Sequence, residues 1–209
     1  MLRIGVMVSG GGTNLQAIMD KIDDGTLKDC SVVTVVSSNS KAYAIQRAKK
    51  RQIPVEVISR KSFEDSAHYD RALINHMKKY DVQLVVLAGF LSLLGEGFVK
   101  EYRNAIINVH PSLIPSFCGK GFYGIIPHKK ALEYGVKITG ATVHFVEPEY
   151  DSGPIILQKA VAVMSNDTPE TLQQRVMEQV EWEILPEAIR LFSEGRLSVN
   201  GRKVDIRES

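Results

Sequence analysis

The sequence predicts an α/β fold with a mostly parallel central sheet and helices on both faces. Four strand-like runs are short, rich in Val and Ile and mostly continuous, as in strands covered on both faces: Arg3–Val8, Ser31–Ser37, Val55–Ile58 and Val82–Leu87. Helical candidates alternate with these runs: Asn14–Asp23, Ala42–Arg51 and Glu64–Tyr80. Such alternation is typical of right-handed βαβ crossovers, so the arrangement is Rossmann-like.

The second half of the chain predicts a different pattern, with later strands that make the sheet mixed. Five further elements are expected in chain order: strand Ala105–His110, a helix near Pro127–Tyr134, strands Ala141–Val146 and Ile155–Val163, and a long helix over Thr168–Gly195. Leu172, Val176 and Val180 follow helical spacing, and Pro186 should kink or restart this C-terminal helix. Asn200-Gly201 predicts a small hairpin over Leu197–Val204.

Composition excludes several classes of protein. The 26 Lys and Arg nearly balance the 24 Asp and Glu, and no basic run exceeds Lys49-Lys50-Arg51, so no nucleic-acid patch is expected. The apolar run Val82–Leu94 is too short and too polar for a membrane span, and the N-terminus has no signal-peptide pattern. Cys30 and Cys118 form no close-spaced pair, which indicates reduced thiols and a cytoplasmic protein.

Three polar residues at the ends of apolar runs form a candidate catalytic group. Asn108 and His110 lie two residues apart in the predicted strand Ala105–His110 and therefore share a face. Pro111 ends the strand, at the edge of the sheet where ligands bind in open α/β folds. Asp151 follows about forty residues later in an Asp-Ser-Gly-Pro turn. An amide, an imidazole and a carboxylate can stabilise an oxyanion and move a proton, although a plain strand end is the alternative.

The glycine cluster Ser9–Asn14, between the first strand and the first helix, predicts an anion site. Glycines allow backbone N–H groups to approach a phosphate, and the helix N-terminus adds partial positive charge. Leu15 stands where a dinucleotide fingerprint needs its third glycine, and no Gly-Lys-Ser/Thr follows, so a single phosphate is expected. The alternative is a tight turn that needs positive φ.

Other candidates are weaker. Cys118 could be a nucleophile, but a free cysteine in a small-residue loop is more often passive. His110, His128, His144 and Asp151 lack metal-ligand spacing, so no metal is expected, and His144 is interpreted as a structural histidine. The glycine-rich loop Phe117–Gly124 could act as a lid or be an ordinary surface loop.

Four motifs together resemble the phosphoribosylglycinamide formyltransferase family, and the resemblance covers essentially the whole chain. They are Ser9-Gly-Gly-Gly-Thr-Asn14-Leu-Gln-Ala-Ile18, Ala88-Gly89-Phe90, Asn108-Val-His110-Pro-Ser-Leu-Ile-Pro115 and Val143-His-Phe-Val followed by Asp151-Ser-Gly-Pro154. The resemblance implies formyl transfer from the co-substrate 10-formyltetrahydrofolate to the amine of glycinamide ribonucleotide, in purine biosynthesis. It also implies one formyltransferase domain over 1–209, with a phosphate-binding half (1–104) and a catalytic, folate-binding half (105–209).

The resemblance assigns roles residue by residue. Asn108, His110 and Asp151 match the catalytic trio, with His110 expected as an imidazolium. Gly12, Thr13 and Asn14 match the phosphate loop. Glu181 matches an acidic residue at the glycinamide and ribose end of the substrate, in a helix one residue longer here. The residues implied to bind folate are Leu91, Ser92, Leu93, Leu94, Asn108, Glu147, Pro148, Glu149, Tyr150 and Asp151.

The chain departs from the family pattern at two serines. Some members have arginine where Ser66 and Ser92 stand, near the folate tail, and serine cannot replace a bidentate arginine–carboxylate pair. Arg60 and Lys61 are the nearest basic candidates. The expected partners are the two small-molecule substrates, with no nucleic acid and no membrane, and the expected state is a monomer or weak homodimer.

Three alternatives stay open at this point. Methionyl-tRNA formyltransferase would resemble this core but would add a basic C-terminal domain, whereas only the Leu197–Val204 hairpin is expected after the last helix. Formyltetrahydrofolate hydrolase would carry an extra N-terminal regulatory domain, whereas the first strand here starts at Arg3. A non-enzymatic phosphoribosyl-binding module would use the glycine loop but would leave the trio unexplained.

Overall fold

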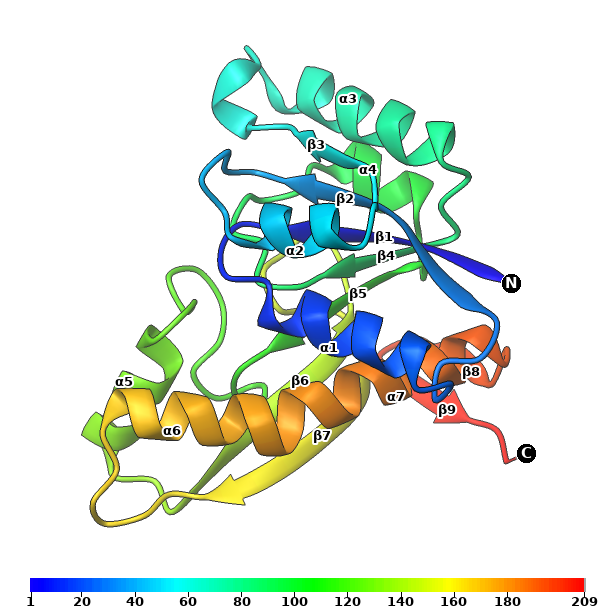
Figure 1. Ribbon diagram of the computed structural model, residues 1–209. Coiled ribbons are helices and arrows are strands. Elements are labelled where there is room, and N and C mark those ends of the chain that lie inside the picture. The colour runs from blue at the N-terminus through cyan, green and yellow to red at the C-terminus, as the bar shows by residue number, and fades with distance from the viewer. Residues whose placement is uncertain (209) are drawn as a thin grey trace. The chain divides into compact units, whose positions relative to one another are not determined.

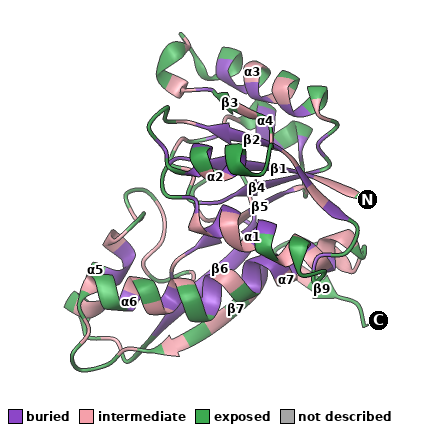
Figure 2. Ribbon diagram, viewed as in Figure 1, coloured by how far each residue is buried: buried purple, intermediate pink, exposed green. Residues whose placement is uncertain are grey.

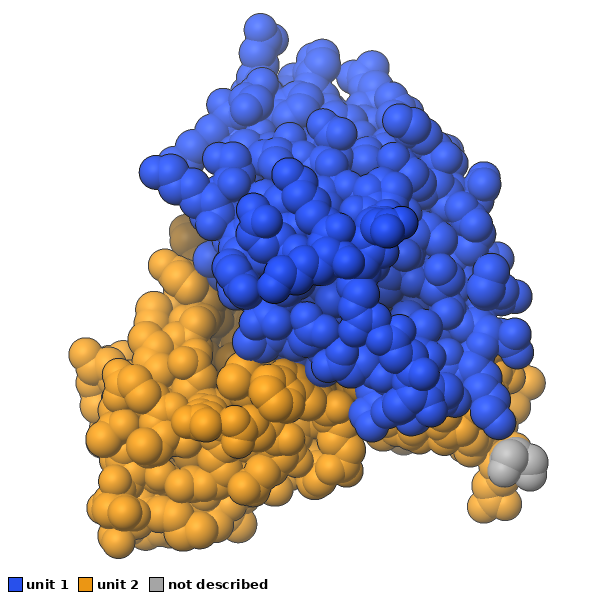
Figure 3. All heavy atoms as spheres, viewed as in Figure 1, with its two compact units in different colours: residues 1–108 blue, residues 109–209 orange. Residues whose placement is uncertain are grey.

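The computed structural model describes residues 1–208 and confirms the predicted α/β class. The strand order is β3-β2-β1-β4-β5-β6-β7, mostly parallel with an antiparallel final pair, and a separate two-stranded β8-β9 hairpin follows. The chain divides into two compact units, Met1–Asn108 and Val109–Ser209, shown in two colours in Figure 3. The division falls inside β5, four residues after the predicted 104/105 boundary.

The first unit is a set of parallel strands with helical crossovers (Figure 1). Its strands are β1 (Leu2–Val8), β2 (Cys30–Ser37), β3 (Val55–Val57), β4 (Leu84–Leu87) and the start of β5 (Ile106–His110). Its helices are α1 (Thr13–Asp23), α2 (Ala44–Lys50), the 3₁₀ turn η1 (Arg60–Ser62), α3 (Ser66–Lys79) and α4 (Glu96–Glu101). The register pairs Ile4 with both Val32 and Leu84.

Burial explains why these strands read as continuous apolar runs. Every residue of β4 is buried, and β1 is buried from Ile4 to Val8, as the purple strands of Figure 2 show. A strand covered on both faces has no solvent side and therefore needs no polar alternation. The predicted fourth strand begins two residues later than expected, at Leu84, because Val82 bonds back to the end of α3 through Met77 O.

Helix α4 was not predicted, and a tertiary contact explains its formation. Its sequence contains Gly97 and is only Glu96–Glu101, so helix propensity is poor. The buried carboxylate of Asp70, on α3, accepts hydrogen bonds from Gly95 N–H at 2.9 Å and Phe98 N–H at 3.2 Å. These N–H groups would otherwise lack partners at the helix start. A cap from a distant segment leaves no local sequence signal.

The second unit holds the antiparallel strands and the C-terminal helices. Its elements are α5 (Ile126–Tyr134), β6 (Ile138–Phe145), β7 (Ile155–Ala162), α6 (Pro169–Val176), a π-helical turn η2 (Met177–Glu181), α7 (Trp182–Ser193), β8 (Leu197–Asn200) and β9 (Lys203–Ile206). Strand β6 pairs with β7 from Ile138↔Ala162 to His144↔Ile155. No helix within residues 1–208 is long and apolar enough to cross a membrane.

The C-terminal helix is interrupted before Pro186 rather than at it. Thr168 caps α6 by a reciprocal capping box with Thr171, and the helix then widens into η2 before α7 resumes at Trp182. Pro186 lies inside α7, where its missing N–H would have bonded to the Trp182 carbonyl. A π turn accommodates one extra residue in a helix, and here it ends at Glu181.

Candidate active site

His110 lies in a buried position at the end of β5. Asn108 and His110 occupy alternate positions of this strand, and His110 is only 4% exposed. Its Nε2 is 3.0 Å from the carbonyl oxygen of Phe117, and its Nδ1 is 3.5 Å from Asp151 Oδ2. Each ring nitrogen therefore faces an oxygen acceptor. Such a site satisfies both N–H groups only when the ring is protonated.

Asp151 connects this histidine to two other segments of the second unit. Its Oδ2 accepts a hydrogen bond from Gly119 N–H at 2.7 Å, and its Oδ1 is 3.7 Å from His144 Nε2. Burial raises the pKa of Asp151, but His144, His110 and the Gly119 N–H together outweigh burial, so the net pKa is lowered. Asp151 is therefore a carboxylate at neutral pH. Its backbone is left-handed, with φ of 50°, in the turn before β7.

Burial lowers the pKa of His110, and the charge of Asp151 and the Phe117 carbonyl only partly oppose this effect. The lowered pKa favours the neutral imidazole form of His110 at neutral pH. This differs from the sequence-based expectation of an imidazolium, because sequence cannot weigh desolvation against one carboxylate. A neutral ring between two acceptors can take up a proton from a reacting group.

Two other histidines lie near this pair, and sequence reasoning undervalued both. His144, interpreted as structural, donates a hydrogen bond from Nδ1 to Phe145 O at 2.7 Å, and its Nε2 faces Asp151. His128 on α5 is 1% exposed, and neither ring nitrogen has a hydrogen-bond partner in the described part of the chain. Burial, with a smaller effect of His110, lowers the pKa of His128 to about 4.

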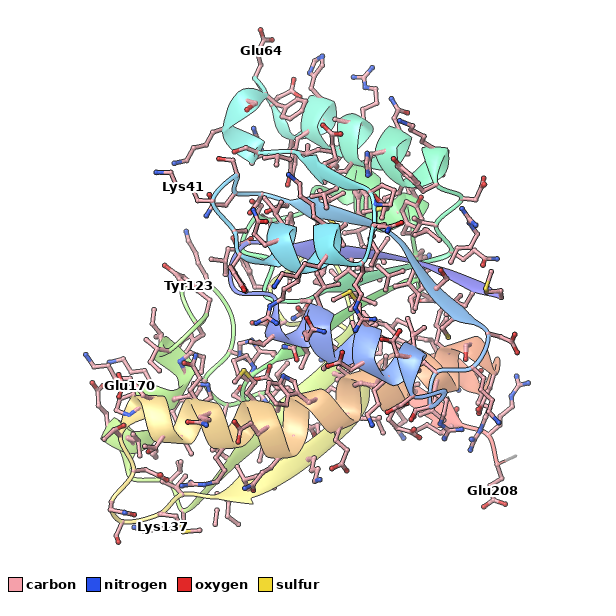
Figure 4. All side chains as sticks on the ribbon, viewed as in Figure 1. Lys41, Glu64, Tyr123, Lys137, Glu170 and Glu208 are labelled. Carbon is pink, nitrogen blue, oxygen red and sulfur yellow. The ribbon has the colours of Figure 1, made fainter. Side chains whose placement is uncertain are left out.

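The loop between β5 and α5 supplies backbone groups to this site. Phe117 O and Gly119 N–H bind His110 and Asp151, so the start of the predicted lid Phe117–Gly124 is held against the catalytic pair. Farther along this loop, Tyr123 is labelled in Figure 4 and is 52% exposed. The thiol of Cys118 lies 3.3 Å from Pro115 O, and burial followed by the charge of Asp151 raises its pKa, which argues against a nucleophile.

The four candidate metal ligands do not form a metal centre. Within residues 1–208, no three His, Cys, Asp or Glu side chains are grouped to hold a metal ion. His110 and His144 instead lie on either side of the Asp151 carboxylate, at 3.5 Å and 3.7 Å from its oxygens.

The glycine loop of the first unit contains one glycine that the backbone requires and two glycines with free space around them. Gly12 caps α1 with φ of 72°, and a Cβ there would lie 2.6 Å from the Cβ of Ala44 on α2. The tight-turn alternative therefore applies to Gly12. Gly10 and Gly11 have no positive φ, and a Cβ on either would meet nothing within 4 Å. Their lack of a side chain leaves the exposed backbone open to an approaching anion.

Arg47 is a residue of this loop that the sequence did not reveal. Its Nε donates to Gly11 O at 2.9 Å, its Nη1 donates to Gln16 Oε1 at 3.1 Å, and its guanidinium lies 5.1 Å from the centre of the Tyr43 ring. A cation held against the loop adds positive charge beside the N-terminus of α1.

The other two residues that the resemblance assigns to the phosphate loop start α1. Thr13 is half-buried, and Asn14 is buried.

The remaining candidates lie in three segments. Glu181 is 8% exposed at the end of η2. In the first unit, Leu91 and Leu93 are 59% and 49% exposed while Leu94 is buried, so two large apolar side chains are left to contact a ligand. In the second unit, Glu147–Tyr150 form an exposed turn, in which Ser152 Oγ donates to Glu149 O at 3.0 Å.

Comparison with known proteins identifies the family of this chain. The model of the formyl transferase family matches residues 2–189. The chain belongs to this family. Within the formyl transferase family it is 39% identical to phosphoribosylglycinamide formyltransferase of Haemophilus influenzae, over 94% of this chain and 90% of that protein. It is 37% identical to the Escherichia coli protein of the same name, over 95% and 91%.

Longer relatives carry the same region. The chain is 39% identical to the trifunctional purine biosynthetic protein adenosine-3 of Bos taurus over 96% of this chain, but it spans only 19% of that protein's length. Among solved structures, glycinamide ribonucleotide transformylase 1 from Symbiobacterium toebii superposes with a TM-score of 0.93 at 42% identity, covering 100% and 95%. A formyltetrahydrofolate deformylase from Pseudomonas syringae gives 0.87 at 27%, covering 99% of this chain and 66% of that one.

Proposed function

We propose that this chain transfers the formyl group of 10-formyltetrahydrofolate to the amine of glycinamide ribonucleotide, giving formylglycinamide ribonucleotide and tetrahydrofolate in de novo purine synthesis. The observation that carries the proposal is the buried His110–Asp151 pair, at 3.5 Å, at the end of a strand that also bears Asn108. The open glycines of the phosphate loop and the named relatives support it.

The proposed chemistry begins with attack of the glycinamide nitrogen on the formyl carbon. A C–N bond forms, the formyl oxygen becomes an oxyanion, and the attacking nitrogen carries an extra proton. Asn108 donates its amide N–H to the oxyanion, which costs little reorganisation because the strand fixes its position. The neutral His110 takes the extra proton and becomes an imidazolium beside the Asp151 carboxylate.

The second step breaks the bond between the formyl carbon and N10 of the folate. His110 returns the proton to N10 as this nitrogen leaves, so the proton count balances and no other reactant is needed. Before this cycle, Phe117 O must release His110 Nε2, because both nitrogens are otherwise occupied. The first segment of the loop thus acts as a lid over the proton-transfer residue.

Substrate binding is assigned to both units. Gly12, Thr13 and Asn14, with Gly10, Gly11 and Arg47 as additions from the structure, would hold the phosphate of glycinamide ribonucleotide. Glu181 would bind its glycinamide and ribose end. Leu91–Leu94 and Glu147–Asp151 would hold the folate, with Leu91 and Leu93 offering apolar surface. A cytoplasmic site of action and a monomer or weak homodimer both stay predictions from the sequence.

One assay tests the proposal against its nearest rival. The purified protein is mixed with 10-formyltetrahydrofolate, and tetrahydrofolate formation is measured with glycinamide ribonucleotide, with initiator tRNA, and with water alone. The proposal expects fast turnover only with the ribonucleotide, and loss of that turnover in His110→Ala. Equal tetrahydrofolate formation in water would favour hydrolysis, the reaction class named for the Pseudomonas syringae relative.

A further inference from the structure

Ser9 stands between two loops of the first unit that the proposed function assigns to different substrates. It follows the last residue of β1 and opens the glycine loop, and it is only 8% exposed. Its backbone N–H donates to Gly89 O at 3.1 Å, in the segment that follows β4. A direct backbone hydrogen bond thus joins the start of the phosphate loop to the residues just before the folate segment Leu91–Leu94.

The side chain of Ser9 makes a second connection to the folate segment. Its Oγ accepts a hydrogen bond from Leu91 N–H at 2.8 Å and shares a 2.6 Å hydrogen bond with Ser38 Oγ. Ser38 in turn follows β2, and its N–H donates to Val8 O at 3.0 Å. One buried hydroxyl therefore joins the ends of β1, β2 and β4.

The far end of the folate segment is also held. Asp70 binds Gly95 N–H and Phe98 N–H, which fixes the chain immediately after Leu94. The segment Leu91–Leu94 is therefore held at one end by Ser9 and at the other by Asp70, and Leu91 and Leu93 project into solvent between these anchors. A shift of Ser9 changes the position of the Leu91 N–H directly, while a shift at Asp70 would have to move two helices.

We propose that Ser9 is a positioning residue that couples phosphate binding at the glycine loop to folate binding at Leu91–Leu94. Binding of an anion by the N–H groups that follow Ser9 fixes the backbone of Ser9, and its Oγ then fixes Leu91. The second ligand meets a segment that is already ordered and binds more tightly. Thermodynamic linkage requires the effect to be equal in both directions. The inference rests on the proposed function, which supplies both ligands.

The test uses a pair of ligands that bind without reacting: glycinamide ribonucleotide and tetrahydrofolate, which has no formyl group to give. The dissociation constant of each ligand is measured by calorimetry, alone and with the other at saturation. For each ligand, the coupling factor is its dissociation constant alone divided by its dissociation constant with the other ligand at saturation. We expect about fivefold or more in the unsubstituted protein, the lower end of typical coupling. In Ser9→Ala we expect a coupling factor below about twofold. The affinity for each ligand measured alone should change by a smaller factor than the coupling factor does.

Two further variants make the result decisive. Ser40→Ala removes the hydroxyl of an exposed serine of the neighbouring loop and should keep the full coupling factor. Ser9→Cys keeps the side-chain size with a weak acceptor, and it replaces Ser9→Ala if melting shows that variant to be unfolded; it too should lose coupling. Thermal melting of every variant checks the fold.

The outcomes separate this inference from the proposed function. A coupling factor of one in the unsubstituted protein, or full coupling in Ser9→Ala, overturns the role of Ser9. Weakening of both ligands by Ser9→Ala at an unchanged coupling factor also overturns it, because that is the result of a purely structural role. Failure of the unsubstituted protein to bind either ligand, or to transfer formyl groups, overturns the proposed function itself.

Discussion

His110 gains its chemical character from the groups on either side of its ring. Asp151 on one side and the Phe117 carbonyl on the other can each accept a hydrogen bond from a ring N–H. Burial nevertheless keeps the resting ring mainly neutral. Burial makes protonation of the ring costly in free energy, and the two acceptors already in place offset part of that cost. This balance suits a group that takes a proton from one nitrogen and gives it to another.

The first prediction concerns the trio. His110→Ala should lower kcat by about 10²- to 10⁴-fold, because proton transfer is lost. Asn108→Ala should lower it by about 10²- to 10³-fold, the usual cost of one oxyanion donor. Asp151→Asn should lower kcat while leaving the affinity for glycinamide ribonucleotide nearly unchanged. Steady-state kinetics and direct titration measure these effects.

Thermal melting is the control for all three variants, since His110 is buried and its removal leaves a small cavity. If a folded His110→Ala protein retained most of the kcat, the catalytic centre would be misassigned.

His128 gives a second prediction, on acid stability. Its pKa is about 4 in the folded state against 6.5 for an unperturbed histidine, so the unfolded chain binds a proton first as the pH falls. Stability is therefore unaffected above pH 6.5 and falls between pH 6.5 and 4, by up to about 3 kcal/mol. His128→Leu should remove this dependence and should not destabilise the protein at pH 7, because both ring nitrogens lack partners.

Denaturant unfolding at pH 7, 5.5 and 4.5 measures the effect of His128→Leu. His68→Gln is the matched control, because His68 has a side chain 56% exposed. An equally steep loss of stability in His128→Leu would assign the acid sensitivity to other groups.

At the scale of the element, the glycine loop divides into positions with different requirements. Gly12 needs its left-handed backbone and its close approach to Ala44, whereas Gly10 and Gly11 have no such structural need. A substitution at Gly12 therefore tests folding as much as binding. Gly11 is the position that separates the two.

The third prediction follows from this division. Gly11→Ala should raise the dissociation constant of glycinamide ribonucleotide by about tenfold or more, equivalent to about 1.4 kcal/mol, with the melting temperature and folate affinity unchanged. Gly12→Val should lower the melting temperature and weaken both ligands, because its Cβ meets Ala44. Titration of each ligand with melting of each variant decides this. If Gly11→Ala bound the ribonucleotide with unchanged affinity, the loop would have a structural role and would not bind the phosphate.

The elements also show which features the sequence can predict. Continuous apolar runs located the parallel strands, and the two-residue spacing of Asn108 and His110 placed both on one strand. Helix α4 was missed because Asp70, far away in sequence, caps it. The π turn before Trp182 was not predicted, because the apolar spacing of this region is that of a regular helix. Arg47 and His110 each contact a backbone carbonyl oxygen, of Gly11 and of Phe117, and a backbone group carries no residue-type signal.

At the scale of the whole molecule, charge is nearly balanced, with a formal net of +2. Long-range attraction of anionic substrates is therefore weak, and binding must depend on cations placed near each ligand. Arg47, held against the glycine loop through Gly11 O, is the cation that we propose for the phosphate. For the folate tail, the resemblance predicts that Ser66 and Ser92 stand where some family members have arginine. Arg60 and Lys61 are the substitute cations that the sequence suggests.

The structure distinguishes these two cations. Arg60 donates from Nη1 to Phe63 O at 3.0 Å and lies 5.9 Å from the centre of the Tyr69 ring, so its guanidinium is partly engaged within the protein. Lys61 is exposed in the 3₁₀ turn η1. If a cation here binds the tail, Lys61 should contribute more than Arg60.

The fourth prediction tests this compensation. Arg60→Gln with Lys61→Gln should weaken folate binding at low salt and flatten the dependence of its dissociation constant on salt, because two charges near a carboxylate are lost. Lys61→Gln alone should reproduce most of the effect, and the affinity for glycinamide ribonucleotide should not change. Lys28→Gln with Lys203→Gln removes the same number of exposed charges elsewhere and is the control. Folate affinity that is identical to the unsubstituted protein across the salt series would show that the tail stays in solvent, with the folate held through its ring system alone.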